Sequence, residues 1–359
     1  MIYLDYQATT PLAPEAREAM LPWLGGPDTA GFANPHSPHR AGRAAAAAIE
    51  VARDQVARLL PSGGRVIFTG SATEAINLAI LGTRPGLIAV SAIEHAAVLD
   101  TAAASGAEVD VLAVDGEGLV SADYPLAGGT TLVAVMHVNN EIGTIQPVDA
   151  IAKRAHEAGA LFLCDAVQGA GKLAPPADAD FIALSAHKLY GPKGIGALWV
   201  RDGVDLAPLI HGGGQEAGLR SGTLSPALCA GFGAAAAVAV DRMSDDAAHV
   251  KGLWRAALAL LPDWELNGSS DTRWHGNLNL RRDGLDVARL MSDLRDVCFS
   301  AGSACASGSG RPSHVLRAIG LTDRQAKSSI RLGFGRYTGY QELEDACARI
   351  EAAAVAQGV

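Results

Sequence analysis

The chain has 359 residues, which is enough for two or three domains and a large buried core. Hydrophobic residues make up 49% of it and charged residues 19%, a globular composition that excludes a mainly disordered chain. With 29 Lys and Arg against 38 Asp and Glu the net charge is −9, and no basic run offsets it, so direct nucleic-acid binding is not expected. The longest apolar run, residues 227–240, is too short to span a bilayer, and the N-terminus lacks the basic segment of a signal peptide.

Short apolar segments rich in β-branched residues alternate with Ala-rich helical patterns through the first two-thirds of the chain. A long helical pattern covers residues 43–60. Strands are then expected at residues 65–69, 87–91, 108–114, 131–137, 161–165, 181–185 and 195–200, with helices at 72–81, 96–104 and 150–158. This alternation predicts an α/β fold in which a mostly parallel sheet is flanked by helices on both faces.

The composition changes after the apolar helix predicted at residues 227–240. The segment MSDDAAHVKGLWRAAL, which begins at Met243, predicts a separate charged amphipathic helix, and turn-rich sequence follows it. We therefore expect a large α/β domain over residues 14–243 and a smaller α+β domain over residues 244–359. The extended N-terminal arm, residues 1–13, is assigned to the smaller domain.

The cysteines are odd in number, scattered, and contain no CxxC pair, which argues against disulfides or a zinc site and favours a reducing cytoplasm. Four lie in apolar strand or helix contexts that are typical of inert core thiols: Cys164, Cys229, Cys298 and Cys347. Cys305 alone lies in a loop of Gly, Ser and Ala, SAGSACASGSG, which suits a nucleophile that must move.

Two turns rich in small residues are candidate anion sites. Residues 69–74, TGSATE, follow a predicted strand and open a helix, where backbone N–H groups favour an anion; the alternative is a plain capping box. The run HGGGQEAGLRSGT, residues 211–223, could form a backbone nest, or it could be a flexible surface loop. The segment GAGKL at 169–173 lacks the earlier glycine and the following hydroxyl of a P-loop, so a nucleotide loop is excluded.

Two charged residues are expected at the ends of buried strands. Asp165 ends ALFLCD, where open α/β sheets bind ligands, or else it caps the next turn. Lys188 follows DFIALSAH, and a partly desolvated amine there would have a lowered pKa and could form a Schiff base; the alternative is a lysine that reaches the sheet edge. Weaker polar candidates are His95, Asn140, Gln168 and Arg331. The first could stack on a ring or be a core histidine, and the last could hold a carboxylate or pair with a surface acid.

One cofactor needs all of these features together, namely pyridoxal 5′-phosphate (PLP). PLP requires a lysine amine, a carboxylate for its ring nitrogen and backbone donors for its phosphate. The candidates are Lys188 for the amine, Asp165 for the carboxylate and the 69–74 turn for the phosphate, with the 211–223 run as a second anion site. The sequence therefore predicts a PLP enzyme.

Ten segments, taken in order from about residue 3 to residue 338, resemble the cysteine desulfurases, which are fold-type I PLP enzymes of the class V aminotransferase group. They are LDYQATTPL, NPHSPHRAGR, ATEAINLAI, EHAAVLDT, MHVNNEIGTIQP, DAVQGAGKL, SAHKLYGPKGIGALWVR, HGGGQEAGLRSGTL, SAGSACASG and SSIRLGFGRYT. The resemblance implies that Lys188 binds PLP covalently, Asp165 pairs with the ring nitrogen and Gln168 contacts the ring hydroxyl.

The resemblance also implies roles for the other candidates. His95 would stack on the ring and help with proton transfer, and Asn140 would touch the cofactor. The phosphate would be held by Ala72, Thr73, Ser185 and His187, with Thr223 contributed by the other subunit of a homodimer. Asn34 and Arg331 would bind the substrate carboxylate.

The implied reaction converts L-cysteine to L-alanine and leaves the sulfur as a persulfide on Cys305, for transfer to an acceptor protein. That acceptor would be an iron–sulfur scaffold or a thiolation enzyme for tRNA or a cofactor. No resident metal is implied, and Cys305 would meet an iron–sulfur cluster only through its persulfide.

Two features depart from the family pattern: the small-residue order in Gly-Ser-Ala-Thr-Glu-Ala and Val167 in place of the usual Thr. Because the chain ends soon after Glu351, docking of a scaffold through a long C-terminal tail is in doubt. The alternative function is that of another class V PLP enzyme, either a selenocysteine lyase or an aminotransferase, which would not need Cys305 for sulfur transfer.

Overall fold

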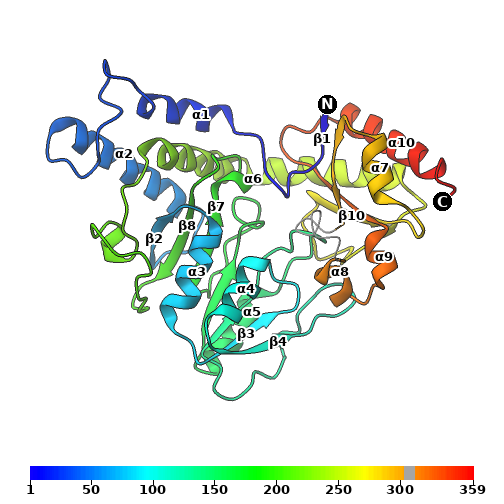
Figure 1. Cartoon of the computed structure of the whole chain (residues 1–359), viewed down its shortest axis with the longest axis horizontal. Helices are drawn as coiled ribbons and strands as arrows, with labels where there is room; N and C mark the ends of the chain where they lie inside the picture. Colours follow the sequence, from blue (N-terminus) through cyan, green and yellow to red (C-terminus); the bar gives the residue numbers. More distant parts are fainter. Residues whose placement is uncertain (303–311) are drawn as a thin grey trace.

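The computed structural model describes residues 1–302 and 312–359. Cys305, the predicted nucleophile, lies outside the described residues. Figure 1 shows a large domain built around one sheet and a smaller domain at the C-terminal end of the chain, with the N-terminal arm running between them.

The large domain contains a seven-stranded sheet with the order β2-β8-β7-β6-β5-β3-β4. Its strands are β2 (Gly64–Thr69), β3 (Leu87–Ser91), β4 (Glu108–Leu112), β5 (Leu132–Ala134), β6 (Leu161–Asp165), β7 (Phe181–Ser185) and β8 (Gly196–Arg201). Strands β3 to β7 pair in parallel, and only β8 runs antiparallel to its neighbours. The predicted α/β fold is confirmed, although β4 and β5 are shorter than expected.

Helices cover both faces of this sheet. Each face packs against its helices in an apolar cluster, so the sheet is buried on both sides. The helices are α1 (Pro14–Met20), α2 (Arg40–Ala57), α3 (Ala72–Thr83), α4 (Ala96–Ala104) and α5 (Val148–Glu157). Short 3-10 turns occur at Leu21–Trp23, Ala186–Lys188 and Glu216–Gly218.

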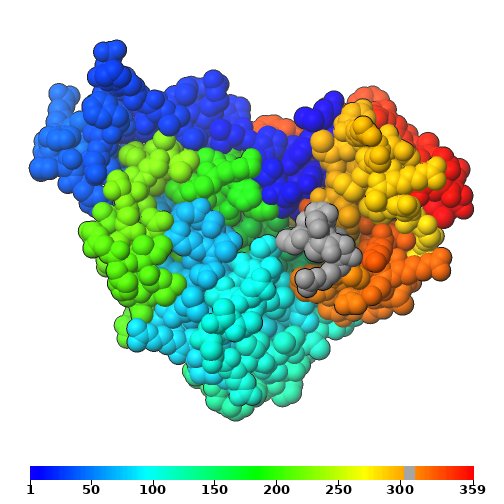
Figure 2. Space-filling view, viewed as in Figure 1, coloured from blue at the N-terminus to red at the C-terminus, as the bar shows by residue number. Residues whose placement is uncertain are grey.

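The smaller domain packs helices onto an antiparallel sheet with the order β12-β13-β10-β9. Its strands are β9 (Glu265–Leu266), β10 (Asn277–Arg281), β12 (Ser300–Ala301) and β13 (Ser329–Gly333), and its helices are α7 (Val287–Asp293), α8 (His314–Ala318), α9 (Asp323–Lys327) and α10 (Tyr340–Val355). In the N-terminal arm, β1 (Ile2–Tyr3) pairs with β11 (Val297–Cys298) of this domain. Figure 2 shows the arm at the junction of the two lobes.

The prediction of two separate helices around residue 243 is wrong. A single helix, α6 (Pro226–Leu260), runs through this point. Its first half contributes Cys229 and Phe232 to the large-domain core, and its second half contributes Val250 and Leu253 to the smaller core. The change in composition therefore reflects a change in what the helix packs against, not a break. The domain boundary at 243/244 stays a prediction.

Helix α6 is also the one helix in the described ranges that is long and apolar enough to cross a membrane by length and composition. The argument from the short apolar run therefore no longer applies. Helix α6 packs against α1, α2 and α10, and its charged Asp246 is buried against Arg336 of the smaller domain. These contacts are those of a core helix that joins two domains.

Candidate active site

A cavity of about 290 Å³ lies where β6 and β7 end, between the two domains. The parallel register places Asp165 opposite Ala183, so that the chain after β7 continues past the end of β6. The cavity is lined by Gln7, Ala8, Ser71, Ala72, Thr73, Ile76, His95, Ala97, Met136, Val138, Asn140, Asp165, Val167, Gln168, Ser185, His187, Lys188 and Arg331. Ten of the predicted site residues therefore meet in one cavity.

Lys188 reaches the cavity from the 3-10 turn that follows β7. Its side chain is half-buried, and Nζ donates hydrogen bonds to the backbone carbonyls of Gln7 (2.5 Å) and Ala8 (2.8 Å). The arm is tied to the same turn, because the His187 carbonyl accepts from the Thr10 amide at 2.9 Å. The arm therefore sets the position of the candidate Schiff-base amine.

Asp165 ends β6 and is only 6% exposed. Burial raises the pKa of its carboxyl, while His95, the Val167 amide and Lys188 oppose that shift. The Val167 amide donates to Oδ1 at 3.0 Å, which orients the carboxylate. A cationic partner such as a protonated ring nitrogen would offset the desolvation cost and keep this group ionised.

His95 is the N-cap of α4, and its Nδ1 accepts a hydrogen bond from the Ala97 amide at 3.0 Å. An acceptor at Nδ1 places the ring proton of neutral His95 on Nε2. The structure thus fixes the tautomer of the ring that lines the cavity beside Asp165.

The anion end of the cavity is the N-terminus of α3. Ser71 Oγ accepts from the Glu74 amide at 3.2 Å, whereas the Glu74 carboxylate accepts from the Gly70 amide at 2.7 Å instead of completing a capping box at Ser71. The first N–H groups of a helix have no intrahelical acceptor, so those of Ala72 and Thr73 suit a phosphate. A Cβ on Gly196 would lie 2.7 Å from the Ala72 nitrogen, so a glycine is needed where β8 passes this turn.

Ser185 and His187 border the same end of the cavity. His187 Nδ1 lies 3.1 Å from Thr9 Oγ1. Burial and the nearby Lys188, Lys193 and Lys172 lower the pKa of His187 to about 4, so its ring is neutral at pH 7. It can therefore serve as a neutral hydrogen-bonding group.

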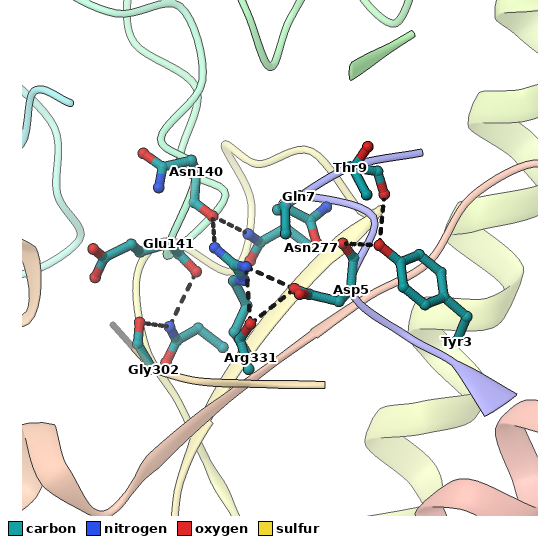
Figure 3. Close-up of polar contacts among 12 residues, drawn as sticks. Tyr3, Asp5, Gln7, Thr9, Asn140, Glu141, Asn277, Gly302 and Arg331 are labelled. Carbon is teal, nitrogen blue, oxygen red and sulfur yellow. Dashed lines mark hydrogen bonds and ion pairs between the residues drawn. The ribbon is translucent and has the colours of Figure 1, made fainter. Parts of the chain in front are cut away.

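Arg331, on β13 of the smaller domain, lines the cavity. Figure 3 shows it at the centre of a polar network. Its guanidinium is buried and donates to Asp5 Oδ1 at 2.7 Å and to the Asn140 carbonyl at 3.0 Å. Ser300 Oγ donates to the same Asp5 oxygen at 2.9 Å. Asp5 is therefore the counter-ion of Arg331.

Sequence reasoning missed Asp5 and Gln7 as site residues. Gln7 is 4% exposed, and its carbonyl accepts from both Lys188 Nζ and Gln168 Nε2, the latter at 3.0 Å. The signal for Asp5 was a charge inside the apolar segment MIYLDY, but its partner is more than 300 residues away. Gln7 acts mainly through its backbone, which leaves no residue-specific signal.

Three predicted site residues do not meet in this cavity. Asn34 is exposed between α1 and α2, where its Oδ1 accepts from the His36 amide at 2.8 Å. Thr223 is exposed at the end of the 211–223 run. Cys305 lies outside the described residues. Their roles stay predictions. Of the four thiols expected to be core, Cys298 is only half-buried.

The residues present fit PLP. The cavity offers an amine, a buried carboxylate and a helix N-terminus on three sides, which is the set of groups that this cofactor requires. Within residues 1–302 and 312–359, no group of three His, Cys, Asp or Glu side chains could hold a metal ion.

Comparison with known proteins agrees with this site. The aminotransferase class-V family model matches residues 2–345. Two curated relatives are the proteins named cysteine desulfurase IscS of Rickettsia bellii (42% identical, covering 96% of this chain and 88% of the relative) and of Rickettsia typhi (40% identical, covering 98% and 91%). A solved NifS-like protein aligns with a TM-score of 0.90 at 31% identity over 100% of both chains, and a structure of SspA in complex with cysteine aligns at 0.81 and 37% identity over 94% of this chain and 100% of that one. The chain therefore belongs to the aminotransferase class-V family, among its cysteine desulfurases.

Proposed function

We propose that this protein is a PLP-dependent cysteine desulfurase, which converts L-cysteine to L-alanine and passes the sulfur to Cys305 as a persulfide. The observation that carries the proposal is the meeting of Lys188, Asp165 and the N-terminus of α3 in one cavity. The relatives named cysteine desulfurase, about 41% identical over nearly the whole chain, support the same reaction.

When bound, PLP supplies an electron sink for the charge that develops at the substrate α-carbon. Asp165 would hold the ring nitrogen in its protonated form, because the buried carboxylate gains from a cationic partner. The Lys188 amine would hold the cofactor and, in its amine form, would be the base that moves the α-proton. His95, with its ring proton on Nε2, would stack on the ring and present that atom for proton transfer.

Arg331 binds the substrate carboxylate, with Asn34 as the second predicted contact. Arg331 borders the cavity from the smaller domain and carries a fixed charge at its wall. The Cys305 thiolate then attacks the substrate sulfur, the C–S bond breaks with its electron pair on the carbon side, and protonation gives L-alanine.

The active unit in this proposal is a cytoplasmic homodimer, with Thr223 reaching the phosphate of the other subunit. Thr223 is exposed, and Arg220 in the same loop pairs with Glu74 at 2.7 Å, beside the anion turn. Mixing the Lys188→Ala and Thr223→Ala proteins tests this, because a mixed dimer regains one site with both residues. Activity that does not rise on mixing, in proteins shown to exchange subunits, contradicts the dimer.

The persulfide passes from Cys305 to an acceptor protein, which is an iron–sulfur scaffold or a thiolation enzyme. The test of the reaction is release of L-alanine from L-cysteine without a keto-acid, together with a sulfur adduct on Cys305 detected by mass spectrometry. The Cys305→Ser protein should bind PLP but form no adduct. Alanine formation that requires a keto-acid, or full turnover by Cys305→Ser, supports the alternative class V enzymes instead.

A further inference from the structure

Lys172 is a half-buried lysine for which the proposed reaction has no use. It lies four residues after Gln168, behind the cavity wall, and it borders a small void of about 20 Å³ beside Tyr6, Asp246 and Trp274. No described carboxylate forms an ion pair with it. Burial and the neighbouring Lys188 lower the pKa of Lys172 to about 7. A lysine in such a place is costly, which calls for a compensating role.

The polar contact that Lys172 makes is with Gln168. Its Nζ donates to Gln168 Oε1 at 3.4 Å, while Gln168 Nε2 donates to the Gln7 carbonyl at 3.0 Å. A flipped amide would bring its oxygen against the Gln7 carbonyl and, wherever Lys172 is protonated, its NH2 group against the ammonium. Both neighbours therefore select the same orientation of the amide.

In this orientation the amide oxygen of Gln168, a residue that lines the cavity, is taken up by Lys172, and its amide nitrogen is left as the polar group for a ligand. An amide nitrogen has two hydrogens, and the Gln7 carbonyl takes one of them. The second is the group that a ring hydroxyl oxygen of PLP would accept. We propose that Lys172 is a positioning residue, which fixes the Gln168 amide with its N–H toward the cofactor hydroxyl. This inference rests on the proposed function.

The expected readout is the pH at which the visible absorbance of the bound cofactor changes. A donor to the hydroxyl oxygen stabilises its unprotonated form. Losing that donor therefore raises the pH at the midpoint of the absorbance change, called the midpoint below. A hydrogen bond of ordinary strength corresponds to a rise of about 0.5–1 pH unit. Apart from Lys172 itself, the charged and titratable groups around this point stay the same in every variant: Tyr6, His95, Asp165, His187, Lys188, Tyr190, Asp246, Arg331 and Arg336.

The experiment is a double-mutant cycle with Lys172→Met, Gln168→Ala and the double variant, each loaded with PLP. Lys172→Met and Gln168→Ala should each raise the midpoint by about 0.5–1 pH unit and weaken PLP binding to the apo protein by about 3–10-fold. The double variant should match Gln168→Ala, because Lys172 has nothing left to position. Lys153→Met, on the exposed face of α5, is the matched control and should change neither value.

Two results overturn the inference: an unchanged midpoint in folded Lys172→Met, or additive shifts in the double variant, which mean that the lysine acts by its charge alone. If Lys172→Met does not fold, Lys172→Arg, whose side chain is long enough to keep an N–H donor near Gln168, serves instead. It should keep the wild-type midpoint, and a raised midpoint contradicts the positioning role. A wild-type protein that binds no PLP would instead refute the proposed function.

Discussion

Replacing Asp5 with Asn should tighten the binding of a carboxylate ligand. Asp5 Oδ1 lies 2.7 Å from Arg331 Nη2, so in the cavity without substrate its charge neutralises the guanidinium that is proposed to bind the substrate carboxylate. Two unit charges about 4 Å apart attract by about 4 kcal/mol at an effective dielectric of 20. The Asp5 side chain is 19% exposed, so solvent weakens this attraction, and Asn keeps a hydrogen-bond acceptor for Arg331. The part of the attraction that Asp5→Asn removes, and that opposes binding of a ligand carboxylate, is therefore about 1–2 kcal/mol. L-Alanine should therefore bind Asp5→Asn about tenfold more tightly.

The assay is a titration of the PLP-loaded protein with L-alanine and, separately, with ethylamine, followed by absorbance. Ethylamine lacks the carboxylate, so its affinity should not change in Asp5→Asn. Unfolding in urea checks that the variant is folded, because Arg331 keeps the Asn140 carbonyl and Ser300 as partners. Weaker L-alanine binding with unchanged ethylamine binding would refute the reasoning and would mean that Asp5 orients Arg331 instead of competing for it.

Three other predictions concern stability, the anion turn and the thiols. Burial raises the pKa of Glu94 to about 8, above its ordinary value of 4.5, so between these values the folded state holds a proton that the unfolded state releases. The contribution of Glu94 to the free energy of unfolding is therefore complete below about pH 4.5 and is lost as the pH rises toward 8. Glu94→Gln should reduce this loss, as measured by urea unfolding at a series of pH values. Gly196→Ala places a Cβ 2.5 Å from the Ser71 carbonyl carbon and should weaken PLP binding at least tenfold, whereas Gly86→Ala, which meets nothing within 4 Å, should not. Burial raises the pKa of Cys229 and Cys347 to about 12, so alkylation at pH 8 should spare both in the native protein and label both after denaturation.

Local patterns were enough to predict the α/β fold with its mostly parallel sheet. Strand-helix alternation predicted β6 and β7 with the bounds that the structure has, because these strands are buried on both faces and read as continuous apolar runs. The same reasoning failed at α6, where a helix continues although its surroundings change. A sequence pattern records the polarity of a helix surface, and that polarity changed when the helix passed from one core to the other.

The candidate site was predictable where the function of a residue depends on its own chemistry and its place at a strand end, as for Asp165 and Lys188. It was not predictable where a role is made by a distant partner. Asp5 gains its role from Arg331, and the Gln168 amide is oriented in part by the carbonyl of Gln7, 161 residues away. Such pairs form only once the arm has folded across the end of the sheet.

The Gly-rich run at residues 211–223 illustrates the same limit, since its sequence fits both an anion nest and a flexible loop. Glu216 in this run pairs with Arg53 at 2.7 Å, and its side chain is 2% exposed. The same carboxylate accepts from the Phe68 amide at 2.7 Å, and Arg220 pairs with Glu74. Breaking a buried ion pair of this kind by removing one partner costs about 3–5 kcal/mol, so the run is held firmly against β2 and the start of α3. The exposed Thr223 is proposed to reach a fixed point in another subunit, which requires the backbone that carries it to be held in place. Each freely rotating bond between the two points would lower the population of the binding geometry.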